Sequence, residues 1–345
     1  MATETASAAD GLVFGDRTMG NPMVLTMATT GPSAEERTVR IPFASTSLNI
    51  DIDWGDGTTT NHVATANPER VYAAEGTYTI QVTGAARALG FSTVSTRWST
   101  KLRSVIQWGS LGLTSLASAF KGYTGTSLPL PSDIPSGVTT LRAMFLDAAL
   151  TTAPDVSGWN TGNVLLIENI FRGMTGLASP PDVSGWNTAK VTNMGLAFYN
   201  CINLNTPPDV SSWNTGAVTS LQEMFQLCSS FASAPNVASW NTAKVQNMTS
   251  TFRQMGAIDI PCDDWSIAGV TTPSSFDSMF HLTTLPTARY DSLLVKWEAQ
   301  AVKPVGANFH GGSSKYTAAP SAAATARASL ADPATNNWTM TDGGT

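Results

Sequence analysis

Carboxylates close together in this sequence are its first candidates for chemistry, because oxygen ligands bind hard cations. Asp51, Asp53 and Asp56 lie close together, and the last of them sits in a Gly-Asp-Gly turn. A tight glycine turn beside carboxylates suits Ca²⁺, but the spacing does not match the ligand positions of an EF-hand loop. We interpret these residues as solvated aspartates of a strand and its turn, and a calcium site remains the alternative.

A second set of polar residues recurs at a fixed step. Three aspartates supply one carboxylate per step, which is too few for a row of calcium sites, so we expect them to cap turns. Four asparagines at the same step predict an internal ladder of amides that satisfies loop backbone groups. The aspartates are Asp155, Asp182 and Asp209, and the asparagines are Asn160, Asn187, Asn214 and Asn241.

Histidines offer little support for catalysis. His62, His281 and His310 are the only ones, and none forms a pair with metal-ligand spacing. The sequence contains no G-x-S-x-G motif and no phosphate-binding glycine loop. We therefore expect no catalytic residue, no metal site and no cofactor, and we predict that the protein is not an enzyme.

The three cysteines are an odd set and do not form a disulfide framework. Cys201 and Cys228 each follow a repeated phenylalanine by three residues, so they occupy equivalent positions. We interpret them as neighbours in a ladder of small buried residues. A disulfide between them is the alternative if the two Cα atoms lie within about 6 Å.

These candidate residues are set in one stretch that the chain repeats four times. It begins as D-V-S-x-W-N-T, or N-V-A-S-W-N-T in the last copy, and returns every 27 residues. A fixed period of this kind indicates an array of stacked units, each too small to be stable alone. The repeated aromatic residues predict the core of the stack: Trp159, Phe171, Trp186, Phe198, Trp213, Phe225, Trp240 and Phe252.

Within each unit the apolar residues also predict local structure. Val164, Ile167 and Phe171 follow one another at steps of three and four, which places them on one face of a short helix. The preceding D-V-S-x-W segment predicts a short extended piece. If the repeated residues form the core, recognition must use the positions that vary between units: Gly162-Asn163, Ala189-Lys190, Gly216-Ala217 and Ala243-Lys244.

These units resemble the BspA-like leucine-rich repeat, whose consensus is D-V-S-x-W-N-T-x-x-V-T-x-M-x-x-M-F. Degenerate units ending at Phe120 and Phe145 extend the array, and we assign residues 96–282 to it. The family occurs on bacterial surface proteins and in bacteriophage structural proteins. The resemblance implies a curved solenoid with short parallel strands and short helices, used for binding or as a spacer.

The segment before the array predicts strands. Leu48 to Trp54 alternates apolar and polar residues, and the motif WGDGT followed by VYAAEGTYTIQVTG resembles the PKD-type immunoglobulin-like β-sandwich. Trp54, Gly55, Asp56, Gly57 and Tyr78 carry this resemblance, although Arg70 stands where the family often has histidine. We assign 23–95 to this module and 1–22 to an N-terminal arm.

The last part, 283–345, predicts a C-terminal α/β cap. Tyr290, Leu293, Leu294 and Trp297 have the spacing of an amphipathic helix, and the alanine-rich 321–330 predicts a second helix. A final strand is expected near Trp338. The predicted fold class is therefore mixed β and α/β, with an N-terminal β-sandwich followed by a leucine-rich-repeat solenoid.

Composition narrows the function. Only 13% of residues are charged and the net charge is −6 with no basic cluster, which argues against nucleic acid and anionic membranes as partners. No apolar run reaches the length of a transmembrane helix, about 18 residues. The first residues, MATETASAADGLVFGD, lack the basic and apolar regions of a secretion signal.

From these observations and the two resemblances, we expect a non-enzymatic structural protein of a bacteriophage particle. It would be a capsid decoration, head fibre or tail fibre at the virion surface. Its N-terminal region would contact other virion proteins, and its array would contact a host-surface protein or glycan. We expect several copies per assembly or a homo-oligomer. The alternative is a secreted or cell-surface bacterial adhesin whose signal has been removed.

Overall fold

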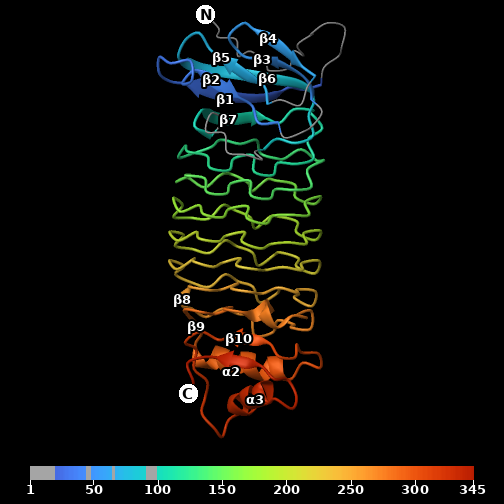
Figure 1. The fold of residues 1–345 in the computed structure, drawn as a ribbon, viewed down its shortest axis with the longest axis vertical. Coiled ribbons are helices and arrows are strands. Elements are labelled where there is room, and N and C mark those ends of the chain that lie inside the picture. The colour runs from blue at the N-terminus through green and yellow to red at the C-terminus, as the bar shows by residue number, and fades with distance from the viewer. Residues whose placement is uncertain (1–19, 44–47, 64–66, 91–98) are drawn as a thin grey trace, which may run out of the picture.

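The computed structural model describes residues 20–43, 48–63, 67–90 and 99–345. Figure 1 shows three parts in sequence order along one long axis: a sheet, a stack of flat turns, and a helical cap. Residues 1–19 of the predicted N-terminal arm lie outside the described residues.

The N-terminal part is built on one antiparallel sheet with the strand order β4-β3-β6-β1-β7. Side chains alternate between its faces, and Ile50, Ile52 and Trp54 are fully buried, as the period-2 pattern predicts. The strands are β1 (Met23–Thr29), β3 (Asn49–Asp53), β4 (Thr59–His62), β6 (Gly76–Ala85) and β7 (Leu102–Gln107).

The predicted β-sandwich is wrong. The only other strands in this described part, β2 (Thr38–Arg40) and β5 (Glu69–Val71), form a two-stranded ribbon of three residues each, which is not a second full sheet. The segment that leads into the stack adds β7 to the edge of β1, so it extends this one sheet instead of forming a second. Because the N–H of Val105 in β7 also donates to the carbonyl of Pro129 in the stack, the sheet continues into the repeats.

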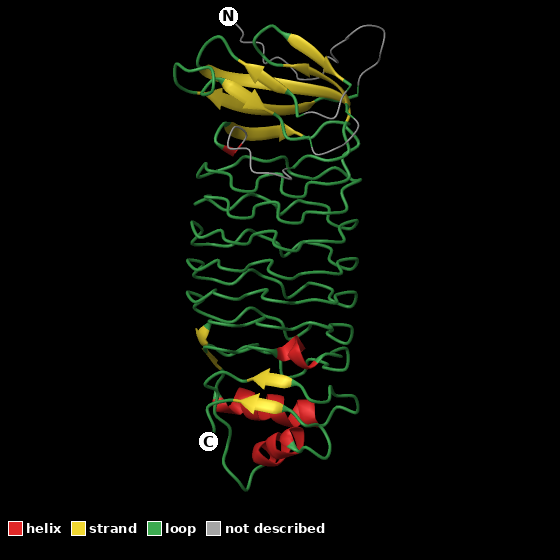
Figure 2. Cartoon of the chain, viewed as in Figure 1, coloured by secondary structure: helices red, strands yellow, loops and turns green. Residues whose placement is uncertain are grey.

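The middle part is a stack of rungs, each formed by one repeat unit. Equivalent residues in successive rungs form single parallel β-bridges in an unbroken series: Ala88, Ser115, Thr140, Leu166, Asn193, Ser220 and Asn247. Figure 2 draws these rungs as loops lying one above another, between the N-terminal sheet and the helices of the C-terminal cap. The repeat period therefore predicts the stacking of units correctly.

The local structure inside each rung differs from the predicted helix. The N–H groups of Ile167, Asn169 and Phe171 donate to carbonyls of the next rung, at 3.4, 3.0 and 2.9 Å. The intervening N–H groups of Ile170 and Arg172 bond three residues back within their own rung. Alternate residues thus hold the rung together and tie it to its neighbour.

Left-handed residues produce this alternation. Asn169 and Gly173 have φ of 59° and 72°, and the next rung repeats this with Leu196 and Asn200 at 57° and 56°. Such a conformation ends an α-helix and costs roughly 1–3 kcal/mol for a non-glycine residue. This conformation lets the backbone form hydrogen bonds with the neighbouring rung, and those bonds offset its cost.

The predicted fold class, with short helices and short parallel strands in a leucine-rich-repeat solenoid, is therefore corrected. Between residues 102 and 272 the structure contains no helix, and the parallel pairing there is limited to single bridges. The largest sheet of the described chain is antiparallel. Apolar spacing of three and four suits both a helix and this folded turn, because both place those side chains on one side.

Two columns of aromatic rings fill the stack. Trp186 and Trp213 have ring centroids 6.2 Å apart and parallel planes, and Phe171 and Phe198 are 5.4 Å apart. Each indole N–H of Trp186 and Trp213 donates to a valine carbonyl of the previous rung at 3.0 Å. All eight predicted core aromatics are at most 4% exposed. The repeated tryptophans therefore both fill and join the rungs.

The C-terminal cap closes the stack. Phe280 continues the phenylalanine column, whereas the extra Phe276 stacks on Trp297 of the cap. The predicted amphipathic face of α2 and the second helix are both confirmed. The elements are β8 (Gly256–Ala257), η1 (Pro273–Phe276), β9 (Thr283–Thr284), α2 (Thr287–Glu298), β10 (Asn308–His310), α3 (Ala322–Ala331) and β11 (Thr339–Thr341).

Candidate interaction surface

The repeated aspartates cap turns at the surface. Asp182 Oδ1 accepts from the N–H and the hydroxyl of Ser184 at 3.0 and 2.7 Å. Asp155 and Asp209 accept in the same way from the serine that lies two positions after each of them. These bonds from Ser184 lower the pKa of Asp182. Each carboxylate therefore accepts hydrogen bonds within its own rung, as our interpretation of these aspartates as turn caps predicts.

The asparagines do not form the internal ladder that we expected. Asn160 is exposed, and its Oδ1 accepts from the N–H of Gly162 at 3.2 Å, so it closes only its own turn. The internal ladder is made by the threonine that follows each asparagine. Those hydroxyls donate across rungs at 2.9–3.1 Å and belong to Thr161, Thr188, Thr215 and Thr242, all at most 2% exposed. The strict recurrence of this threonine beside a buried tryptophan was the available signal.

The exposed asparagine turns form one continuous surface feature, which we call the Asn-turn edge. Because each Oδ1 is used by its own turn, the amide NH₂ groups are the polar groups left for an outside acceptor. Lys190 lies there and donates to Asn163 of the previous rung at 2.9 Å. The Asn-turn edge comprises Asn160, Asn187, Asn214, Asn241 and the varying residues Gly162, Asn163, Ala189, Lys190, Gly216, Ala217, Ala243 and Lys244.

The N-terminal aspartates are each bound to a different partner. Asp56 forms an ion pair with Arg70 at 2.7 Å, and burial raises its pKa less than bonds from Thr58 and Arg70 lower it. Asp51 accepts from the Asn61 side chain at 2.7 Å. No group of three or more metal-ligand side chains gathers among the described residues. These carboxylates hold the turn rather than converge on one point.

Trp54 is the one residue of the WGDGT motif that is buried in the core of the N-terminal sheet. The hydroxyl of Tyr72 donates to the carbonyl of Trp54 at 2.7 Å, and the ring of Tyr78 stacks on Tyr72 at 3.8 Å. Gly55 has φ of 73°, and a Cβ there would lie 2.3 Å from the backbone oxygen of Thr79. The motif is therefore required for packing.

Both repeated cysteines are buried free thiols. The Sγ atoms of Cys201 and Cys228 donate to the carbonyls of Phe171 and Phe198 at 3.2 and 3.1 Å. Burial raises the pKa of Cys201 to about 12, so the thiolate is disfavoured. The structure therefore agrees with the interpretation as a buried ladder.

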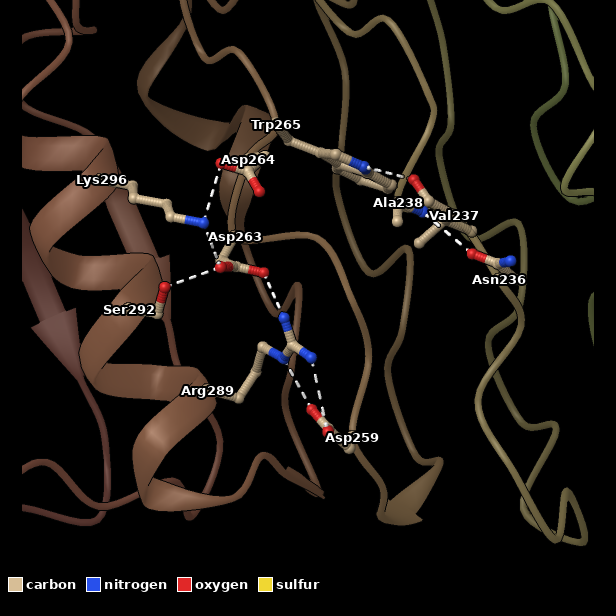
Figure 3. Close-up of polar contacts among 10 residues, drawn as sticks. All are labelled: Asn236, Val237, Ala238, Asp259, Asp263, Asp264, Trp265, Arg289, Ser292 and Lys296. Atoms are coloured by element: carbon tan, nitrogen blue, oxygen red, sulfur yellow. Dashed lines mark hydrogen bonds and ion pairs between the residues drawn. The ribbon is translucent and has the colours of Figure 1, made fainter.

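An ionic cluster fastens the cap to the last rung (Figure 3). Asp263 is 5% exposed and accepts from Ser292 and Lys296 at 2.7 Å each, and it pairs with Arg289. Burial raises the pKa of Asp263, but the hydrogen bonds from α2 outweigh burial and hold it well below its usual value. Asp263 replaces the serine of the D-V-S pattern, which is the sequence signal for this contact. Its role is attachment of α2.

An open groove of about 410 Å³ lies beside this cluster. Asn236 and Asp259 are its polar lining residues together with Ser233, and small or apolar side chains make up the rest. Because Arg289 binds the carboxylate of Asp259 at 2.7 Å, that charge is already compensated. Nothing in this lining provides an acid–base pair for catalysis.

Comparisons with known proteins concern the repeats. The model of a family described as "Mycoplasma protein of unknown function, DUF285" matches residues 114–209, 167–287 and 197–319, which together span 114–319. No curated protein and no solved structure matches the chain. In the described part of the chain, no helix has the length and apolar character needed to cross a membrane.

Proposed function

The chain belongs to the DUF285 family, and from that premise we propose that it is a non-enzymatic attachment protein that presents the Asn-turn edge to a surface ligand. One observation carries the proposal: the repeated aromatic and threonine side chains are buried, whereas the asparagines are exposed on every regular rung and the varying residues beside them are exposed or half-buried. A stack of this kind displays the same donors at regular intervals, which suits a ligand with repeating acceptor oxygens.

The ligand class follows from the donors. Amide NH₂ groups and lysine ammonium groups donate hydrogen bonds to hydroxyl, carbonyl and carboxylate oxygens. A glycan or an extended protein segment on a cell surface carries such oxygens in series. Many weak contacts along several rungs give a useful affinity through their number, because each additional contact is made at high effective concentration.

We place the protein on a bacteriophage particle. The N-terminal sheet, with its PKD-like motif around Trp54, would contact other virion proteins, and the stack would project to contact the host. The low share of charged residues and the joining of an N-terminal sheet to a long stack of rungs support this placement. Several copies of the chain would act together.

A second candidate is a bacterial surface adhesin. The description of the family names a bacterial genus, which favours a cellular rather than a viral carrier. Immunogold labelling of purified particles and of cells separates the two. Label on particles supports the virion placement, whereas label confined to the surface of uninfected cells would overturn it in favour of the adhesin.

Binding itself is tested by replacing asparagine with aspartate in two rungs. In Asn187→Asp with Asn214→Asp, the remaining oxygen still caps each turn, but the NH₂ donor is lost and a negative charge is gained. We expect binding to host cells or isolated surface glycans to fall about tenfold or more, which corresponds to about 1.4 kcal/mol. The melting temperature should stay close to that of the original protein.

The matched control is Asp182→Asn with Asp209→Asn on the aspartate turns. These variants also keep the turn caps. They replace a carboxylate with an amide, whereas the test variants replace an amide with a carboxylate. We expect them to bind as the original protein does. Equal binding by both double variants would contradict the assignment of the Asn-turn edge.

A further inference from the structure

Two histidines that are 29 residues apart in the sequence come together where the stack meets the cap. The ring centroids of His281 and His310 are 4.8 Å apart, at an interplanar angle of 64°. His281 follows Phe280 of the last rung, and His310 is the last residue of β10 in the cap. The backbone joins the same two levels, because the N–H of Phe280 donates to the carbonyl of His310 at 3.0 Å.

Each imidazole already uses one nitrogen as an acceptor. Nδ1 of His281 accepts from Nε of Arg253 at 3.2 Å, and Nδ1 of His310 accepts from the N–H of Gly312 at 3.1 Å. A neutral imidazole has one acceptor nitrogen, so both rings are neutral in this arrangement. For the same reason neither ring has a second lone pair for a metal ion. Protonation of His310 would turn its acceptor into a donor that faces the N–H of Gly312.

The charges around the pair make protonation more costly. Arg253 lies on one side, and among the described residues the acidic group that acts on His310 is Asp342, which is already bound by Arg327 and Tyr290. Burial, His281 and Arg253, in that order, lower the pKa of His310. An imidazolium at His310 would place a second positive charge close to the guanidinium of Arg253.

A buried acceptor lies next to this column. Gln226, Arg253 and His281 each follow a phenylalanine of the column and so occupy successive rungs. Oε1 of Gln226 is buried and has no hydrogen-bond partner. In an opened latch, Arg253 would have this oxygen, one rung away, as its alternative acceptor. Two acceptors for Arg253 would give the column the two arrangements that a switch requires.

We propose that Arg253, His281 and His310 form an acid-sensitive latch that holds the C-terminal cap to the stack when both rings are neutral. Acid opens it because protonated His310 repels the N–H of Gly312. That turn has little room to adjust, since a Cβ on Gly312 would lie 1.8 Å from the backbone oxygen of Thr283. The latch is independent of the proposed attachment function.

The experiment is hydrogen exchange of the full chain at pH 7.5 and 5.0, corrected for the intrinsic pH effect. We expect exchange in 308–314 to rise about tenfold at pH 5.0, the factor that one unit of pKa difference gives. In His310→Gln this response should be lost, because glutamine can accept from Gly312 but does not titrate. An unchanged response in His310→Gln would overturn the latch.

Two further variants keep the test decisive. His62→Gln removes the histidine of β4, in the N-terminal sheet, and should leave the response in 308–314 intact. Gln226→Leu removes the acceptor that the opened arrangement uses, so its acid response should be smaller than that of the original protein. A larger response in Gln226→Leu, or the loss of the response in His62→Gln, would contradict the mechanism.

Discussion

Single residues in this protein act across rungs more than within them. The indole of Trp186 stacks on Trp159 and Trp213 and donates to the carbonyl of Val156. The hydroxyl of Thr188, two positions later, donates to the carbonyl of Asn214. One side chain therefore contributes to two junctions, and its loss weakens both.

Trp186→Ala tests this at the residue scale. Removing a buried indole should lower the free energy of unfolding by about 3–5 kcal/mol. Trp186→Phe keeps an aromatic ring but removes the shorter of the two hydrogen bonds to the Val156 carbonyl and leaves only the N–H of Trp159, so it should cost less, about 1–3 kcal/mol. Chemical denaturation measures both. A midpoint unchanged by Trp186→Ala would show that the tryptophans are surface contacts for a ligand.

The sequence is most informative for residues that repeat. The buried aromatic columns follow from the 27-residue period alone. The left-handed φ of Asn169 and Leu196 does not, because it depends on whether an N–H bonds within its own segment or to the next rung. Apolar spacing is the same for both choices. The His281–His310 pair also required the structure, since its two members come from different levels of the stack.

At the scale of elements, the turns determine where one strand ends and the next begins. The Gly-Asp-Gly turn joins β3 to β4, and both of its glycines have positive φ, 73° at Gly55 and 83° at Gly57. Their surroundings differ. A Cβ on Gly55 would meet the backbone of β6, whereas a Cβ on Gly57 would meet nothing within 4 Å.

These two glycines form a matched pair of variants. Gly57→Ala should cost about 1 kcal/mol, the strain of a left-handed alanine. Gly55→Ala adds a clash with the backbone of Thr79, so we expect at least about 2 kcal/mol more, as for overpacked cores. Urea denaturation of both proteins gives the difference. Equal losses of stability would mean that the contact between this turn and β6 is not tight.

At the scale of the whole molecule, the stack is closed at one end by a sheet and at the other by a cap. Each rung leaves backbone donors and acceptors on both sides, so the terminal rungs need partners that differ from a rung. β7 provides them at one end, through Val105 N–H to Pro129. At the other end β10 receives the N–H of Phe280, and α2 is fixed by the ionic cluster around Asp263.

The attachment of the cap should therefore depend on pH through Asp263. Its folded pKa lies below the unfolded value, so its contribution is fully present above about pH 4 and is lost as pH falls through the folded pKa. Below pH 4 we expect the cap to melt before the stack. Asp263→Asn should lower the melting temperature of the cap at pH 7 and weaken its dependence on pH below 4. Calorimetry from pH 2 to 7 measures this.

Asp264→Asn is the matched control. Asp264 also pairs with Lys296, but its side chain is 73% exposed, whereas that of Asp263 is 7% exposed. An exposed ion pair contributes little, typically about 0–1 kcal/mol, because water screens it. The control should therefore melt almost as the original protein does. If Asp264→Asn loosened the cap as much as Asp263→Asn, net charge rather than the buried carboxylate would hold α2 in place.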